Sequence, residues 1–247
     1  MRDLIIGIHS IAEALQNESR SELQLFATDE GLKELKKVVK LGETLKVTCL
    51  TSHDLQERAK ELCKKLEFNY VRVPNGVFLL ADKIEDPDMD LFYSEMRSRE
   101  IVKVLALDGV TDAHNAAAIL RTAAFYGVNY IILPSRSTFG SSPSFYRISS
   151  GAAEHVKIVR TSSLPKLLGK LVKIGVPIIG LSEHADSELL EIAIQGPKVL
   201  VLGSEDKGLS NAVSRNLSHL FAIEPLGNIK SLNVSVAAAI SMERLFS

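Results

Sequence analysis

Three clusters of polar side chains and glycines carry the residue types that could perform chemistry in this chain. They hold Asn115 and Arg121 at 107–127, Glu205 at 202–210, and Ser231 with Asn233 at 223–240. Amides and hydroxyls can orient a polar substrate, while a carboxylate or a guanidinium can bind a charged group or assist proton transfer. Each cluster comes where an apolar run has just ended or where a helical pattern begins. In open α/β sheets ligands collect at the carboxyl ends of strands, so the clusters stand where such a site would form.

Each cluster taken singly also has a purely structural interpretation. Asn115 could cap a helix, Arg121 could be solvated, and Glu205 could be an exposed carboxylate in a glycine-rich loop. Ser231 could cap the final helix, and Asn233 could face solvent. Asn115 and Arg121 are six residues apart, about 240° around a helix, so they cannot share a helix face. We therefore expect a helix that starts between 112 and 115, with Asn115 at its mouth, and that stops at Gly127.

Together and in this order, the clusters closely resemble the three sequence motifs of the SpoU/TrmH family of RNA ribose methyltransferases. These motifs are the Asn-x5-Arg helix, the Gly-x-Glu-x2-Gly loop and the terminal Ser-Leu-Asn-x-Ser helix, and the resemblance covers about 101–247. The start of the chain at 7–15, Gly-Ile-His-Ser-Ile-Ala-Glu-Ala-Leu, is also similar to the ribosomal-protein-like substrate-binding domain of one branch. That branch includes methyltransferases of large-subunit ribosomal RNA. The resemblance implies methylation of a ribose 2′-hydroxyl in structured RNA, with 23S rRNA favoured over tRNA.

The same resemblance implies S-adenosylmethionine as cofactor, a trefoil knot in the C-terminal domain, and a homodimer whose active site takes residues from both subunits. The residues it implies for catalysis are Asn115, Arg121, Glu205, Ser231 and Asn233. Those it implies for cofactor binding are Leu181, Gly203, Ile223, Pro225 and Leu232. The central role falls to Arg121. A guanidinium holds its proton strongly and is a poor general base, so Arg121 either accepts a proton in a strongly perturbed setting or clamps a phosphate.

Regular alternation of strand and helix patterns follows from residue 101 onward. Strand candidates lie at 102–107, 130–133, 155–159, 177–181, 199–203 and 219–224. Strands that are apolar on both faces and separated by helices predict a mostly parallel sheet covered by helices. We therefore expect an α/β methyltransferase domain at 101–247.

The N-terminal part predicts a smaller α/β domain. Apolar runs near 23–27, 45–50 and 69–73 alternate with helical patterns at 31–41 and 53–66. Ser10 and Glu13 have the spacing of a capping box, which predicts a helix start at Ser10. We expect an RNA substrate-binding domain at 1–74, followed by an acidic linker at 75–100, in which 77–80 could add a strand or a short helix.

Four lysines of the 31–41 helical pattern fall on one stripe, opposite Leu32, Leu35 and Val39. They are Lys33, Lys36, Lys37 and Lys40. Such a stripe could bind RNA phosphates, although a solvated helix face would show the same spacing.

Composition excludes several classes of protein. The 247 residues are 46% apolar with a formal charge of −1, so bulk positive charge does not hold a nucleic acid. Residues 1–73 carry twelve basic and twelve acidic side chains, 74–100 three and seven, and 101–247 fourteen and eleven. No apolar run reaches the length of a membrane span and no signal peptide is evident, so we expect a cytoplasmic protein without a membrane partner. Cys49 and Cys63 lack a metal-ligand spacing, so we expect no metal.

Two other functions stay open on the sequence. A non-catalytic RNA-binding protein that keeps the methyltransferase fold is one, because Glu224-Pro225 stands where the family usually has Pro-Met, and because 75–100 is acidic. A nucleotide-using α/β enzyme of another family is the second, but the chain has no Gly-x4-Gly-Lys-Ser/Thr loop to hold phosphates. Cofactor binding separates the first from an enzyme, and nucleotide hydrolysis would support the second.

Overall fold

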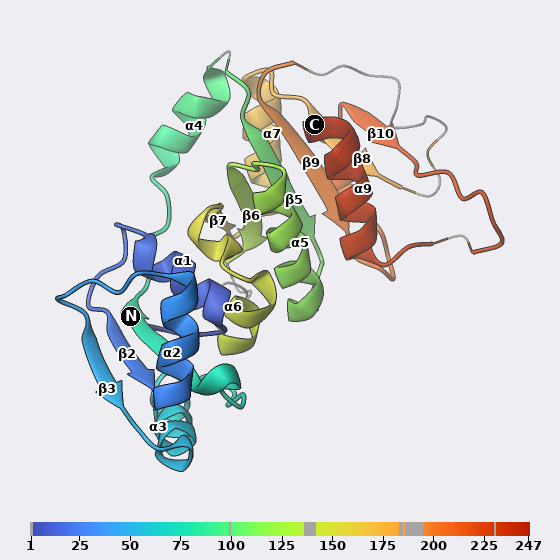
Figure 1. Cartoon of the computed structure of the whole chain (residues 1–247). Coiled ribbons are helices and arrows are strands. Elements are labelled where there is room, and N and C mark those ends of the chain that lie inside the picture. Colours follow the sequence, from blue (N-terminus) through green and yellow to red (C-terminus); the bar gives the residue numbers. More distant parts are fainter. Residues whose placement is uncertain (1, 99, 136–141, 183–184, 186–194, 230) are drawn as a thin grey trace. The chain divides into compact units, whose positions relative to one another are not determined.

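The computed structural model describes residues 2–98, 100–135, 142–182, 185, 195–229 and 231–247. It divides into two compact units, each with its own sheet (Figure 1). Unit 1 comprises Met1–Glu85 and Thr138–Glu154, and unit 2 comprises Asp86–Ser137 and His155–Ser247. In its described part, no helix is long and apolar enough to cross a membrane, and no group of three or more metal-ligating side chains occurs.

Unit 1 contains a mixed four-stranded sheet in the order β1-β4-β2-β3. Its strands are β1 (Arg2–Ile6), β2 (Gln24–Ala27), β3 (Lys46–Cys49) and β4 (Val77–Asp82). Its helices are α1 (Ile8–Gln16), α2 (Asp29–Val38), α3 (Ser52–Lys65) and α6 (Pro143–Ser149), with short 3-10 turns η1 (Pro74–Gly76) and η2 (Ala152–Glu154). Alternate residues of β2 face opposite cores: Leu25 packs with α1 and α2, whereas Phe26 stacks on Phe78 at 4.7 Å and packs with α3. The sheet is therefore covered on both faces.

Unit 2 contains a six-stranded, all-parallel sheet in the order β10-β8-β9-β5-β6-β7, which confirms the predicted α/β class. Its strands are β5 (Lys103–Asp108), β6 (Tyr130–Pro134), β7 (Lys157–Thr161), β8 (Ile178–Leu181), β9 (Lys198–Gly203) and β10 (His219–Phe221). Its helices are α4 (Met89–Arg97), α5 (Ala113–Phe125), α7 (Leu164–Lys173), α8 (Asn211–Ser214) and α9 (Val234–Phe246). α4 and α7 pack on one face of the sheet, and α5 packs beside α9 (Figure 1). The trefoil knot stays a prediction.

The structure departs from the expected N-terminal boundaries at two places. The apolar run at 69–73, expected as a strand, forms none. The last strand of unit 1 is β4, at Val77–Asp82. Val77–Asp82 lies inside the sheet because its backbone pairs with β1 on one side and with β2 on the other. The 75–100 segment, expected as an acidic linker, thus supplies β4 to unit 1 and α4 to unit 2. The strand left open at 77–80 is present as β4, whereas α4 was not expected, because acidic residues flank its short apolar run.

The predicted capping box at the first helix is wrong. α1 begins at Ile8, after Gly7 with φ 97°, and no side chain caps it. Ser10 lies inside the helix, is buried, and donates a 2.5 Å hydrogen bond to the carbonyl oxygen of Tyr146. The hydroxyl of Ser10 therefore bonds to a residue distant in the sequence, and not to the start of its own helix as the spacing suggested.

Candidate functional site

The first cluster is positioned by the start of α5. The Asp112 carboxylate accepts a 2.9 Å hydrogen bond from the His114 N–H and caps the helix, which runs from Ala113 to Phe125. Gly127 follows with φ 66°, the left-handed conformation that ends helices. The predicted start and stop are confirmed, and Asn115 lies in the first turn.

The second cluster is a tight loop after β9. The backbones of Ser204 and Gly208 exchange hydrogen bonds of 3.1 and 2.9 Å, closing the loop on itself. A Cβ at Gly203 would stand 2.2 Å from the carbonyl carbon of Gly208, so only glycine permits this closure. Asp108, at the end of β5, accepts a 2.7 Å hydrogen bond from the Ser210 N–H. These contacts fix the loop that presents Glu205.

Glu205 joins the three clusters through one carboxylate oxygen. Its Oε1 accepts hydrogen bonds from Asn115 Nδ2 at 3.0 Å, Asn233 Nδ2 at 2.8 Å and the Val234 N–H at 3.2 Å. Asn233 Nδ2 also donates to Asn115 Oδ1 at 3.1 Å. The carboxylate lies at the start of α9, where the positive end of the helix dipole favours a negative charge. We call Asn115, Glu205 and Asn233 the amide–carboxylate cluster.

Asn233 also caps α9. Its Oδ1 accepts hydrogen bonds from the Ser235 N–H at 2.9 Å and from Ser235 Oγ at 2.5 Å. The sequence suggested Ser231 as a cap, but the helix begins at Val234. One amide side chain therefore starts the helix and binds Glu205.

A pocket of about 800 Å3 opens beside the amide–carboxylate cluster. All five residues predicted to bind a cofactor line it: Leu181, Gly203, Ile223, Pro225 and Leu232. Glu205 and Ser231 line it too, whereas Asn115 and Asn233 do not. Leu226, in the turn at one wall, is fully exposed at 100%. An apolar wall that is open to solvent suits an organic ligand that buries it on binding.

Arg121 stands apart from these residues. It is exposed on α5, and among the described residues it has no hydrogen-bond or ion-pair partner. Six residues along a continuous helix separate it from Asn115 by about 9 Å along the axis and about 240° around it. A single chain therefore does not bring Arg121 into the amide–carboxylate cluster.

The lysine stripe is only partly helical. Lys33, Lys36 and Lys37 are exposed on α2, but the helix ends at Val38 and Val39 is extended, so Lys40 lies beyond it. Lys37 pairs with Glu34 at 2.5 Å. The stripe thus consists of three lysines rather than four.

Sequence reasoning missed Asp108 as a residue of this region. It ends β5 opposite Gly203 of β9 and binds the loop that carries Glu205. The available signal was its position, an acidic side chain at the carboxyl end of a buried strand.

Comparison with known proteins gives one family match and several relatives. The profile of the SpoU rRNA Methylase family matches residues 103–243. A Staphylococcus aureus protein named as a TrmH family tRNA/rRNA methyltransferase is 29% identical over 98% of this chain and 95% of its own. The 23S rRNA (guanosine-2′-O-)-methyltransferase RlmB of Coxiella burnetii is 31% identical over 96% of this chain and 92% of its own.

Solved structures share the fold. The SpoU methyltransferase AviRb of Streptomyces viridochromogenes, solved with bound AdoMet, superposes with a TM-score of 0.73 at 21% identity. The match covers 98% of this chain and 88% of AviRb. Both units are therefore part of the shared architecture.

Proposed function

The chain belongs to the SpoU rRNA methylase family and is an RNA 2′-O-methyltransferase of that family, and from that premise we propose that it methylates a ribose 2′-hydroxyl of 23S rRNA. The observation that carries the proposal is the meeting of Asn115, Glu205 and Asn233 beside the pocket. The name of the Coxiella burnetii relative supports a ribosomal substrate over tRNA. The Staphylococcus aureus relative is named for both RNAs and does not discriminate.

The pocket fits S-adenosylmethionine. Its volume of about 800 Å3 lies in the range of sites that enclose small organic ligands. Leu181, Ile223 and Leu232 offer apolar walls for the adenine ring, and the turns at 203–208 and 225–227 line the pocket with polar backbone groups. When bound, the cofactor supplies an electrophilic methyl group on a sulfonium.

The chain's own residues then have to align one oxygen and help remove its proton. The amide–carboxylate cluster holds the loop and the start of α9, which are two walls of the pocket, in fixed register. Ser231 lines the pocket without a hydrogen-bond partner among the described residues, so its hydroxyl is available to a substrate. Arg121 either accepts the proton or clamps the adjacent phosphate.

We propose a homodimer because Arg121 of one chain lies away from the pocket of that chain. Arg121 does not line the pocket and is about 240° around α5 from Asn115. A symmetric dimer can bring the same helix of a second chain to that pocket. Val236, 45% exposed on α9, and Phe125, 82% exposed on α5, are apolar surface available to such an interface.

Calorimetry followed by a methylation assay tests the proposed function. The full chain should bind one S-adenosylmethionine per chain and should transfer labelled methyl to unmodified 23S rRNA transcripts. RNA binding without cofactor binding would instead support a non-catalytic RNA-binding protein. Mapping of 2′-O-methyl marks in a deletion strain would identify the nucleotide, and a missing tRNA mark would contradict the ribosomal assignment.

We also propose that unit 1 binds RNA through its lysines. Replacing Lys33, Lys36, Lys37 and Lys40 by alanine should weaken RNA binding and lower the slope of log affinity against log salt, by up to about 0.9 for each phosphate that is no longer neutralised. Cofactor affinity should not change, because these lysines lie in unit 1 and the pocket in unit 2. Binding isotherms at several salt concentrations measure the slope. Since Lys40 lies beyond α2, its single variant should contribute separately, and an unchanged slope in the quadruple variant would leave the stripe merely solvated.

A further inference from the structure

Residues 142–154 belong to unit 1 although they connect two strands of the unit 2 sheet. β6 ends at Pro134 and β7 begins at Lys157, and α6 and η2 lie between them in the chain. The crossover between parallel neighbours normally packs on its own sheet. Here Tyr146 of α6 lies in the unit 1 core with Ile5 and Ile11. The connection of one sheet is therefore built into the core of the other unit. We call residues 142–154 the shared segment.

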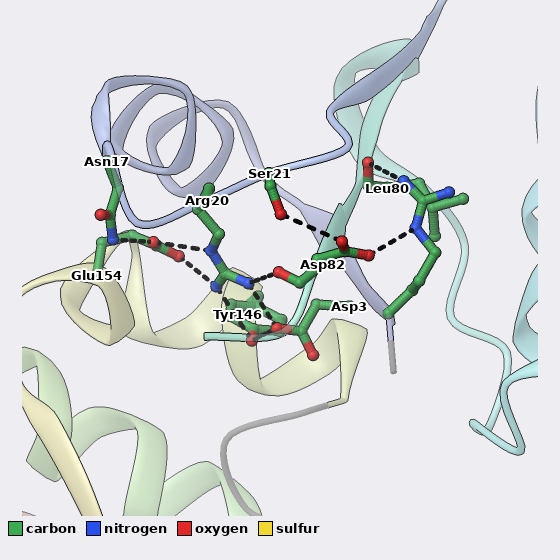
Figure 2. A network of polar contacts seen from close by, with 9 residues as sticks. Asp3, Asn17, Arg20, Ser21, Leu80, Asp82, Tyr146 and Glu154 are labelled. Carbon is green, nitrogen blue, oxygen red and sulfur yellow. Dashed lines mark hydrogen bonds and ion pairs between the residues drawn. The ribbon is translucent and has the colours of Figure 1, made fainter. Parts of the chain in front are cut away.

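A buried polar network joins the shared segment to the rest of unit 1 (Figure 2). Arg20 binds Glu154 through two nitrogens, at 2.7 and 3.0 Å, and binds Asp3 Oδ2 at 2.6 Å. Its Nη1 also donates to the carbonyl oxygen of Asp82 at 2.8 Å. The Tyr146 hydroxyl donates to the same Asp3 oxygen at 2.6 Å. One guanidinium thus joins β1 and β4 to Glu154 at the end of the shared segment, and Asp3 joins the same network to Tyr146 of α6.

Burial makes this network hard to open. The side chains of Arg20, Asp3 and Glu154 are at most 2% exposed. Burial alone would lower the pKa of Arg20, but the hydrogen bond to Glu154 and the neighbouring negative charges outweigh it, and the net direction is upward. Burial and the charge of Asp3 raise the pKa of Tyr146 well above its usual value, so its hydroxyl stays protonated. Removing one member of such a set leaves uncompensated charge inside the protein.

The packing around the network is equally close. Gly151 has φ 94°, and a Cβ there would stand 2.5 Å from Cγ of Glu13 on α1. Ser10 of the same helix donates to the Tyr146 carbonyl oxygen. The shared segment is therefore held by charge, hydrogen bonds and shape together.

The shared segment is also covalently continuous with the sheet that carries the candidate site. Only His155 and Val156 lie between Glu154 and Lys157 at the start of β7. At its other side the chain comes from β6, the neighbour of β5, whose carboxyl end leads into the Asn115 helix. A displacement of unit 1 therefore has a short route through the backbone to β7.

We propose that the shared segment, locked into unit 1 by Arg20, couples RNA binding by unit 1 to cofactor binding and methyl transfer in unit 2. Arg20 is then a positioning residue for methyl transfer, although it touches neither substrate nor cofactor. This inference rests on the proposed function, since it requires that unit 1 binds RNA. It predicts that RNA and cofactor affect each other's affinity, as linkage requires of coupled sites.

The test compares the full chain with Arg20→Lys and with the control Arg58→Lys. Lysine keeps the charge of Arg20 but cannot make its fork of contacts. Arg58 is a matched control because it pairs with Glu61 on the surface of the same unit, with its side chain 43% exposed. The measured quantity is the affinity for S-adenosylhomocysteine, the unreactive product, with and without unmodified 23S rRNA transcript. A second measurement is the single-turnover methylation rate at saturating RNA.

We expect RNA to change the affinity of the full chain for S-adenosylhomocysteine by about fivefold or more. In Arg20→Lys this factor should fall toward one, and the methylation rate should fall by about tenfold. The affinity for S-adenosylhomocysteine without RNA should stay within about twofold of that of the parent. Arg58→Lys should behave as the parent. An Arg20→Lys protein that keeps both the factor and the rate would overturn the proposal. So would a parent enzyme that methylates RNA but shows no coupling. A parent that does not methylate RNA at all would overturn the proposed function instead.

A second variant guards against failure of Arg20→Lys to fold. Tyr146→Phe removes only the hydroxyl that donates to Asp3, without changing charge and with little change in volume. It should reduce the effect of RNA on the affinity for S-adenosylhomocysteine by about half or more. Cooperative thermal unfolding would show that the variant is folded. An unchanged factor in a folded Tyr146→Phe protein would count against the network as the lock.

Discussion

Replacing Arg121 by alanine is expected to slow methyl transfer by about 100-fold, the scale for a group that acts on the reacting charge. Cofactor affinity and the fold should not change. Arg121 is exposed on α5 and has no partner among the described residues, so its removal leaves no buried group unpaired. Single-turnover rates and calorimetric titration with S-adenosylmethionine measure the two quantities. A variant with the full rate would remove Arg121 from the mechanism.

Arg121→Lys separates the two roles that remain open for this residue. A bidentate phosphate clamp needs the planar guanidinium, so lysine should restore little of the rate. A lysine that acts as general base behaves differently, because its ordinary pKa is lower than that of arginine. The variant's rate should then rise with pH over a range in which the parent rate is already flat. A pH profile of the single-turnover rate distinguishes the two.

Mixing two inactive variants tests whether Arg121 serves the pocket of a second chain. Arg121→Ala and Glu205→Ala each damage one part of the site. If the parts come from different subunits, random exchange leaves about a quarter of the sites with both intact, and activity returns on mixing. If both parts come from one chain, every site in a heterodimer still lacks either Arg121 or Glu205. Mixing then restores no activity.

The methyltransferase unit followed closely from the sequence because its signals are local. Val-Leu-Val-Leu at 199–202 predicts a strand that is buried on both faces, and β9 has this character. Asp112 and Gly127 mark the ends of α5 by side-chain capping and by a left-handed backbone. The contacts of Glu205 were less accessible, since they join positions that are 90 and 28 residues away.

The N-terminal unit was harder to predict because its structure depends on contacts between residues that are far apart in the sequence. β4 is a short apolar run whose burial depends on pairing with β1 and β2 rather than on its own pattern. Ser10 has the spacing of a cap but bonds to Tyr146, which is 136 residues away. Nothing near 142–154 in the sequence indicates that Glu154 pairs with Arg20. Long-range burial decides these positions, and one sequence carries no direct record of it.

Glu205→Ala should lower the methylation rate by about 100-fold and, unlike Arg121→Ala, should also weaken cofactor binding by about tenfold. One carboxylate oxygen accepts hydrogen bonds from Asn115, Asn233 and the Val234 N–H. Its loss therefore frees the loop and the start of α9, which both line the pocket. The rate and the affinity should fall together because one anchor holds the cofactor walls and the amides.

Two further variants isolate the charge of Glu205 from its position. Glu205→Gln keeps an acceptor oxygen but removes the negative charge at the start of α9, so we expect an intermediate loss of about tenfold in rate. Asp206→Asn is the matched control, because this neighbouring carboxylate lines the same pocket and has no hydrogen-bond partner among the described residues. Calorimetry and single-turnover rates on all three variants give the comparison. If Asp206→Asn lost as much as Glu205→Gln, the pocket would depend on net negative charge, and the hydrogen bonds of Glu205 would not be the reason for its effect.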